Sequence, residues 1–146
     1  MSGRVRLTIQ RASRLRGIPP DNQFRRWLNA ALVQPADLTL RLVNAAEGER
    51  LNAGFRARKY ATNVLTFVYH AKGADALQGD IVLCAQVIHR EAREQGKSVD
   101  AHYAHMTVHG ALHLAGYDHE SARDAKLMEA REITLLAALG FANPYQ

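Results

Sequence analysis

The sequence predicts an α+β fold, in which a mixed β-sheet of about four strands packs with about five helices. Short runs with strand character alternate along the chain with segments of helical periodicity. The chain has 146 residues, 47% of them hydrophobic, which is enough for one domain with its own core. There is no internal repeat, low-complexity tract or linker, so residues 1–146 are expected to form a single domain.

The first part of the chain contains two expected strands and two expected helices. Residues Arg4 to Gln10 alternate between apolar and polar side chains, which is typical of a strand. The turn at 19–21 predicts the start of a helix, because apolar residues follow it at helical spacing up to Leu32. Leu38 to Val43 alternates again and predicts a second strand, and Ala45 to Phe55 has a helical pattern.

The middle of the chain predicts two more strands and a third helix. Val64 to Tyr69 and Gly79 to Cys84 are rich in residues that favour strands. The polar segment His70 to Gln78 between them is expected to be a loop. Val87 to Gln95 is expected to be a helix that ends near Gly96.

The next segment predicts a buried helix from Asp100, its expected N-cap, to about Ala115. One face carries histidines that follow one another by three or four residues, namely His102, His105, His109 and His113. Its other sides are apolar, as in a helix enclosed by protein. Gly116 is expected to end the helix in a left-handed conformation, so that His119 returns over the histidine face.

A last helix is predicted after this turn. Ser121 and Asp124 resemble a capping box at its start. Its inner side is expected to carry Met128, Leu135 and Leu139, and Gly140 closes it.

Composition restricts the classes of function. No run of about 18 apolar residues occurs, and the N-terminus lacks the apolar stretch of a secretory signal, so neither a membrane span nor export is expected. The only cysteine, Cys84, excludes an internal disulfide, is expected to be a buried, inert thiol, and fits a reducing cytoplasm. The net charge of +5 and the pI of about 9.7 favour a polyanionic partner such as nucleic acid.

The spacing of three histidines predicts a metal site. His109 and His113, four residues apart on one helix face, can reach the same ion, and His119 follows a glycine turn in the frame His-x-x-x-His-x-x-Gly-x-x-His. Three protein ligands leave a fourth position open, which is the catalytic rather than the structural zinc pattern. We expect one Zn²⁺ per chain, although nickel, iron and copper also accept imidazole. Asp118 is an alternative third ligand, and His102 and His105 are expected in the core, at the surface or as partners that orient a ligand.

The same segment resembles the signature of the YbeY family of bacterial metal-dependent endoribonucleases. The likeness lies in the whole run from His109 to His119, and other blocks agree in order from about Leu51 onward. These blocks are Phe55-Arg56 with Thr62-Asn63-Val64-Leu65-Thr66-Phe67, Gly79-Asp80-Ile81, Ala104-His105-Met106, Leu139-Gly140-Phe141 and Pro144-Tyr145. The chain departs from the family at Arg58-Lys59, Ala61 and Thr66. The first 50 residues fit the family only in their order of elements.

The resemblance implies a zinc-dependent endoribonuclease specific for single strands, which acts in 16S rRNA 3′-end processing and ribosome quality control. It implies that the partners are single-stranded RNA, rRNA precursors, and the small ribosomal subunit or its proteins. It also implies that Arg56 is a functional residue and that the ion lies in a basic cleft beside the sheet. With His113 on the metal, Arg56 could hold the scissile phosphate. The general base stays open between His105, Asp118 and water on the metal itself.

Two other functions fit parts of the pattern. The histidine frame is that of metzincin metalloproteases, but Gly110 stands where such proteases keep their glutamate base. A non-catalytic, ribosome-associated RNA-binding protein with a structural metal is the other alternative, and the open coordination position argues against it. Thr62 and Asn63 are expected to stabilise a turn rather than to contact a substrate.

Overall fold

The computed structural model describes residues 5–56 and 62–146, and at 54–56 it describes the backbone alone. The elements are β1 (Val5–Arg11), α1 (Asp21–Ala31), β2 (Ala36–Val43), α2 (Ala45–Arg56), β3 (Val64–Val68), β4 (Leu77–Cys84), α3 (Ala85–Gln95), α4 (Val99–Leu114) and α5 (Ala122–Ala138). Each strand and helix expected from the sequence is present, with ends that differ by a few residues. The fold is therefore α+β, as predicted.

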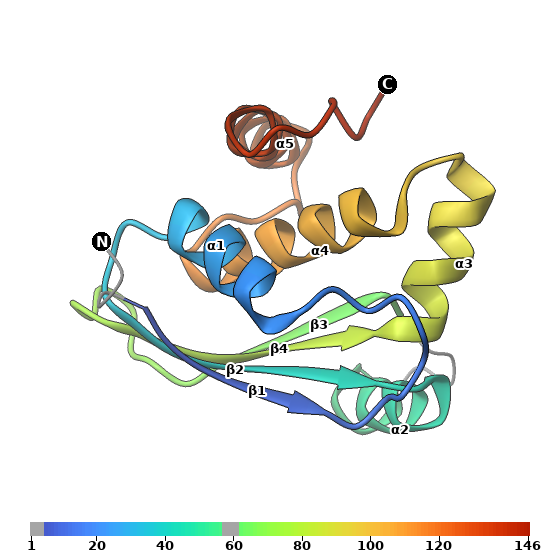
Figure 1. The fold of residues 1–146 in the computed structure, drawn as a ribbon. Helices are drawn as coiled ribbons and strands as arrows, with labels where there is room; N and C mark the ends of the chain where they lie inside the picture. Colours follow the sequence, from blue (N-terminus) through green and yellow to red (C-terminus); the bar gives the residue numbers. More distant parts are fainter. Residues whose placement is uncertain (1–4, 57–61) are drawn as a thin grey trace.

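The strands form one mixed sheet in the order β1-β2-β4-β3 (Figure 1). The strands β1, β2 and β4 run parallel, and β3 runs antiparallel to β4 at the edge of the sheet. In this register Leu40 and Thr66 lie on either side of Ile81. The antiparallel pairing places the start of β3 beside the end of β4, from which α3 departs.

The helices lie on both faces of the sheet. In Figure 1, α1 and α4 lie over one face, α5 packs on α4 on the side away from the sheet, and α2 lies on the opposite face. The main core fills the space between the sheet, α1, α4 and α5, and includes the fully buried Trp27 and Tyr103. A smaller cluster beneath α2 contains Cys84, which is 2% exposed, so this thiol is buried as expected.

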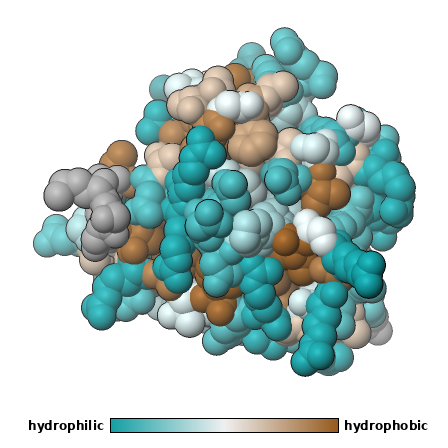
Figure 2. Space-filling model, viewed as in Figure 1, coloured by the Kyte–Doolittle hydropathy of each residue, from teal (hydrophilic) through white to brown (hydrophobic). Residues whose placement is uncertain are grey.

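The surface is mainly hydrophilic where Figure 2 shows it. Hydrophobic residues show on this face as patches between the hydrophilic ones. None of the helices in the described ranges is long and apolar enough to span a membrane.

The buried helix expected from the sequence is α4. Ser98, not Asp100, is its N-cap, because the Ser98 Oγ accepts a hydrogen bond from the Ala101 backbone N–H at 3.1 Å. Asp100 lies instead in the first turn, where a negative charge favours the helix dipole. From 102 to 114 every residue is buried except His109 and His113. Between 102 and 114, α4 is therefore exposed to solvent only at these two histidines.

Candidate metal centre

Three histidine rings come together beside the C-terminal end of α4. The ring centres of His109 and His113 are 6.1 Å apart, and that of His119 lies 5.6 Å from the first and 5.4 Å from the second. Imidazoles that share one zinc ion have ring centres about 5 Å apart, given Zn–N distances of about 2.0–2.1 Å. The three rings of the predicted trio therefore lie together, at spacings somewhat wider than this.

The turn after α4 brings His119 back to the helix. Gly116 has a φ of 106°, a left-handed conformation that side chains resist, as expected from the sequence. The Tyr117 carbonyl oxygen accepts a hydrogen bond from His113 Nδ1 at 2.9 Å. Asp118 Oδ1 accepts one from the His119 backbone N–H at 2.7 Å. The same turn therefore orients one ring and positions another.

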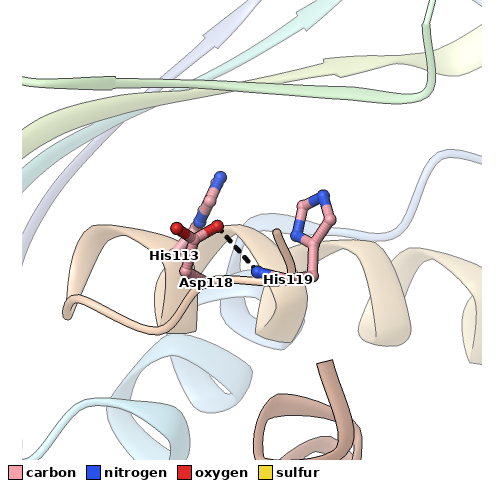
Figure 3. Close-up of side chains that lie close together, drawn as sticks. All are labelled: His113, Asp118 and His119. Atoms are coloured by element: carbon pink, nitrogen blue, oxygen red, sulfur yellow. Dashed lines mark hydrogen bonds between the residues drawn. The ribbon is translucent and has the colours of Figure 1, made fainter. Parts of the chain in front are cut away.

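Asp118 contributes a carboxylate to this group. Ligand atoms of His113, Asp118 and His119 all lie within 4.8 Å of one another (Figure 3). Imidazole and carboxylate are both ligands for zinc and related divalent ions. The described residues thus contain a group able to hold a metal ion, in which both candidates for the third ligand are close to His113.

A polar cleft opens between the rings and the edge strand β3. Its lining consists of the three histidines with Thr62, Asn63, Val64 and Thr66. In Figure 3 the rings of His113 and His119 point toward this strand. Residues at the start of β3 and just before it therefore border the same space as the histidines. Sequence reasoning assigned Thr62 and Asn63 to a turn and did not place them beside the histidines.

A buried carboxylate stands behind His109. Glu132 of α5 has no exposed surface, and its Oε2 accepts a hydrogen bond from His109 Nδ1 at 2.7 Å. Its Oε1 accepts from His105 Nε2 at 2.9 Å and from the Tyr145 hydroxyl. Burial raises the pKa of Glu132, but the bonds from His105, His109 and Tyr145 outweigh it and lower the pKa to about 2. This carboxylate is therefore ionised at neutral pH.

His105 does not reach the cleft. Its ring is buried beneath α5 and donates to Glu132, and burial lowers its pKa despite the opposing effect of that carboxylate. Its second nitrogen, Nδ1, is buried and has no hydrogen-bond partner within the described ranges. This places His105 among the residues that support the site rather than among those that line it.

His102 belongs to a second histidine–carboxylate pair, one turn earlier on α4. His102 Nε2 donates to Glu91 Oε1 at 2.9 Å, and the same oxygen accepts from Asn63 Nδ2 at 3.0 Å. Asn63 also accepts a backbone hydrogen bond at its carbonyl from Cys84 N–H at 3.0 Å. Glu91 thus ties the cleft wall at the start of β3 to α3 and α4.

Glu132 and Glu91 were absent from the residues predicted as functional. Glu132 follows Met128 by four residues and precedes Leu135 by three, so it occupies the inner face of α5. An acid on an apolar helix face is a signal for a buried partner, and it was available in the sequence. Glu91 gives no such signal, because its partners come from distant parts of the chain.

The predicted functional arginine is only partly described. Arg56 is the last residue of α2, and its side chain lies outside what the structure describes. Arg58, Lys59 and Ala61, where the chain departs from the family pattern, also lie outside the described residues.

Comparison with known proteins decides the family. The family model described as Endoribonuclease YbeY matches residues 17–140. The chain belongs to the YbeY family. Endoribonuclease YbeY of Aromatoleum aromaticum is 52% identical over 148 residues, which covers 99% of this chain and 94% of the relative. That of Thiobacillus denitrificans is 49% identical over 145 residues and covers 99% of both chains. The likeness to YbeY proteins thus extends into the first 50 residues, where the sequence alone indicated only a shared order of elements.

A solved structure supports the fold. The chain is similar to the solution structure of TM1509 from Thermotoga maritima, with a TM-score of 0.55 and 22% identity. The match covers 90% of this chain and 91% of that one. At this identity the likeness concerns the arrangement of helices and strands, which it confirms for this YbeY protein.

Proposed function

We propose that this YbeY protein is a zinc-dependent endoribonuclease that cleaves single-stranded RNA in the cleft between α4 and β3. The observation that carries the proposal is the gathering of three histidine rings at a polar opening of a buried helix. Membership in a family named for endoribonuclease activity supports RNA as the substrate. The net charge of +5 favours a polyanion as well.

We propose that His109, His113 and His119 hold the zinc ion, although the ligand atoms that lie within 4.8 Å of one another are those of His113, Asp118 and His119. His109 and His113 each donate a hydrogen bond through Nδ1, to Glu132 and to the Tyr117 carbonyl, so each leaves an Nε2 lone pair free for a metal. We prefer His119 to Asp118 as the third ligand because His119 completes the frame His-x-x-x-His-x-x-Gly-x-x-His. Three such ligands leave one coordination position open to solvent or substrate. When bound there, zinc would acidify a water molecule and stabilise charge on a phosphoryl oxygen.

The residues around the histidines supply the remaining parts of the reaction. Thr62 and Thr66 offer hydroxyl groups to the phosphates or ribose hydroxyls of a bound strand, while Asn63 donates its amide to Glu91 and supports the wall of the cleft. We propose that Arg56 pairs with the scissile phosphate, as a guanidinium can in a bidentate manner. Asp118 is our candidate for the base, since it lies beside His113, whereas His105 is buried behind the site.

The biological substrate that we propose is the 3′ end of a 16S rRNA precursor, handled in the cytoplasm on or near the small ribosomal subunit. The relatives are named as endoribonucleases, which supports an RNA substrate, and the assignment to ribosome maturation rests on the family resemblance. A protease is not favoured, because Gly110 replaces the glutamate base and lies against β3 and β4.

Single substitutions test the proposal. His113→Ala and Arg56→Ala would be assayed on a single-stranded RNA, on a 16S precursor end, and on casein. We expect both variants to lose RNA cleavage and none of the proteins to digest casein. Full cleavage by a metal-free His113→Ala protein would overturn the metal-dependent mechanism, and unchanged cleavage by Arg56→Ala would remove that arginine from it.

A further inference from the structure

Glu132 is the residue through which α5 and the C-terminal segment contact the histidine cluster. Its carboxylate accepts hydrogen bonds from two α4 histidines, at 2.9 Å from His105 and 2.7 Å from His109, and from Tyr145. The side chain has no exposed surface, whereas 23% of the His109 side chain is exposed. Glu132 therefore lies behind the ring and on the side away from solvent.

The contact determines which nitrogen of His109 carries the proton. Glu132 Oε1 accepts from His105 and from the Tyr145 hydroxyl, and Oε2 is the acceptor that faces His109 Nδ1, so His109 presents Nδ1–H to Glu132. A neutral imidazole that is protonated on Nδ1 has its lone pair on Nε2, the atom left for a metal. The bonds from His105 and Tyr145 to the other oxygen hold the carboxylate in this orientation.

His113 obtains the same tautomer in a different way. Its Nδ1 donates to the backbone carbonyl of Tyr117, four residues later in the adjoining turn. That acceptor is part of the local chain and cannot be removed by a side-chain change. His109 depends instead on one side chain from a helix 23 residues away in sequence.

We infer that Glu132 is a positioning residue, which fixes the tautomer and ring orientation of His109 so that its Nε2 faces the metal position. The inference rests on the proposed metal site. Carboxylates that orient a metal-bound histidine in this way raise metal affinity by about 10–100-fold. Glu132 borders a second hollow together with His109, His119 and Tyr145, but it has no exposed surface, so it acts through His109 and not on the RNA.

Glu132→Gln is the test variant, because it keeps the shape of the side chain but replaces one of the two acceptor oxygens with an NH₂ donor. The amide can present its NH₂ group to His109 Nδ1, which favours the tautomer protonated on Nε2. Glu49→Gln, at an exposed position of α2 on the opposite face of the sheet, controls for the loss of one charge. Glu91→Gln controls for the loss of a histidine–carboxylate pair on α4 that contains no proposed ligand.

Two readouts test the inference. Zinc affinity would be measured by competition with a chromophoric chelator, and we expect dissociation constants about 10–100-fold higher for Glu132→Gln and unchanged for both controls. Long-range ¹H–¹⁵N NMR of the metal-free proteins would report the His109 tautomer, which we expect to be Nδ1–H in the wild type and shifted toward Nε2–H in Glu132→Gln.

The outcomes separate this inference from the proposed function. Wild-type protein that binds no zinc would overturn the metal site itself. Wild-type zinc binding with equal affinity in Glu132→Gln, or an equal loss in Glu91→Gln, would overturn only the role of Glu132. If Glu132→Gln does not fold, the wild-type spectrum still decides, because a His109 ring protonated on Nε2 contradicts the inference.

Discussion

Gly110 lies so close to Ile81 that a Cβ on the glycine would stand 3.0 Å from the Ile81 Cγ2. The same Cβ would meet methyl groups of Thr66 and Val64 at 3.4 and 3.5 Å. The position that follows the first histidine therefore faces β3 and β4 at close range. The glutamate that a zinc protease of this histidine frame carries here has no room in this packing.

Replacing Gly110 with glutamate should destabilise the fold. We expect the free energy of unfolding of Gly110→Glu to fall by about 3 kcal/mol or more, through overpacking and burial of a charge. Urea denaturation measures the change, and the control is Ala130→Glu at an exposed position of α5, with an expected change within about 0.5 kcal/mol. A Gly110→Glu protein that is as stable as the wild type, or that digests casein, would contradict this packing argument.

Asn63 should be sensitive to charge because it faces Glu91. Asn63→Ala removes its hydrogen bond to the Glu91 carboxylate, and we expect a loss of about 1–2 kcal/mol in the free energy of unfolding. Asn63→Asp should lose more at neutral pH, since two carboxylates would then face each other, and should recover part of the loss as the pH falls. Chemical denaturation at several pH values checks both statements. Equal stability of wild type and Asn63→Asp at pH 7 would contradict the described contact.

The stability of the metal-free protein should fall in mild acid, in part through His89. Burial and the nearby Arg93 lower the pKa of His89 below 6.5, and its Nε2 lies 2.9 Å from the Tyr103 hydroxyl. The unfolded chain then binds a proton more readily than the folded one. The stabilisation is complete above the unfolded pKa of about 6.5 and is lost as the pH falls through the lower folded value.

The His89→Gln variant isolates this contribution. We expect the free energy of unfolding of the wild type to decline from pH 7.5 to pH 5, and the decline to be smaller in the variant. The remaining decline is assigned to His105, whose pKa is also lowered by burial. Identical pH profiles for wild type and His89→Gln, measured by urea denaturation, would show that His89 does not carry the effect.

Much of the fold could be predicted from local patterns in the sequence, namely the spacing of residues along helices and the glycine at a turn. Apolar residues at helical spacing located α1, the spacing of the histidines located α4, and the left-handed Gly116 explained the return of His119 to α4. The start of α4 was misplaced because Ser98 and Asp100 are both good N-caps, and only the hydrogen bond to Ala101 distinguishes them.

The sequence predicted the grouping of the three histidines but not the residues behind them. The spacing of His109 and His113 places them on one helix face, and His119 follows the glycine turn, so the sequence alone could group the three. Glu132 and Glu91 depend on how α5 and α3 dock on α4, which is a matter of tertiary packing. Neither residue is near the histidines in sequence.

The most direct test of the central claim is the cleavage of a single-stranded RNA by protein stripped of metal with a chelator and then supplied with zinc. We expect stripping to lower the cleavage rate by at least about a hundredfold, and one equivalent of zinc per chain to restore it. The stripped His113→Ala protein should stay inactive when zinc is added. Undiminished cleavage by the stripped wild-type protein would contradict the account.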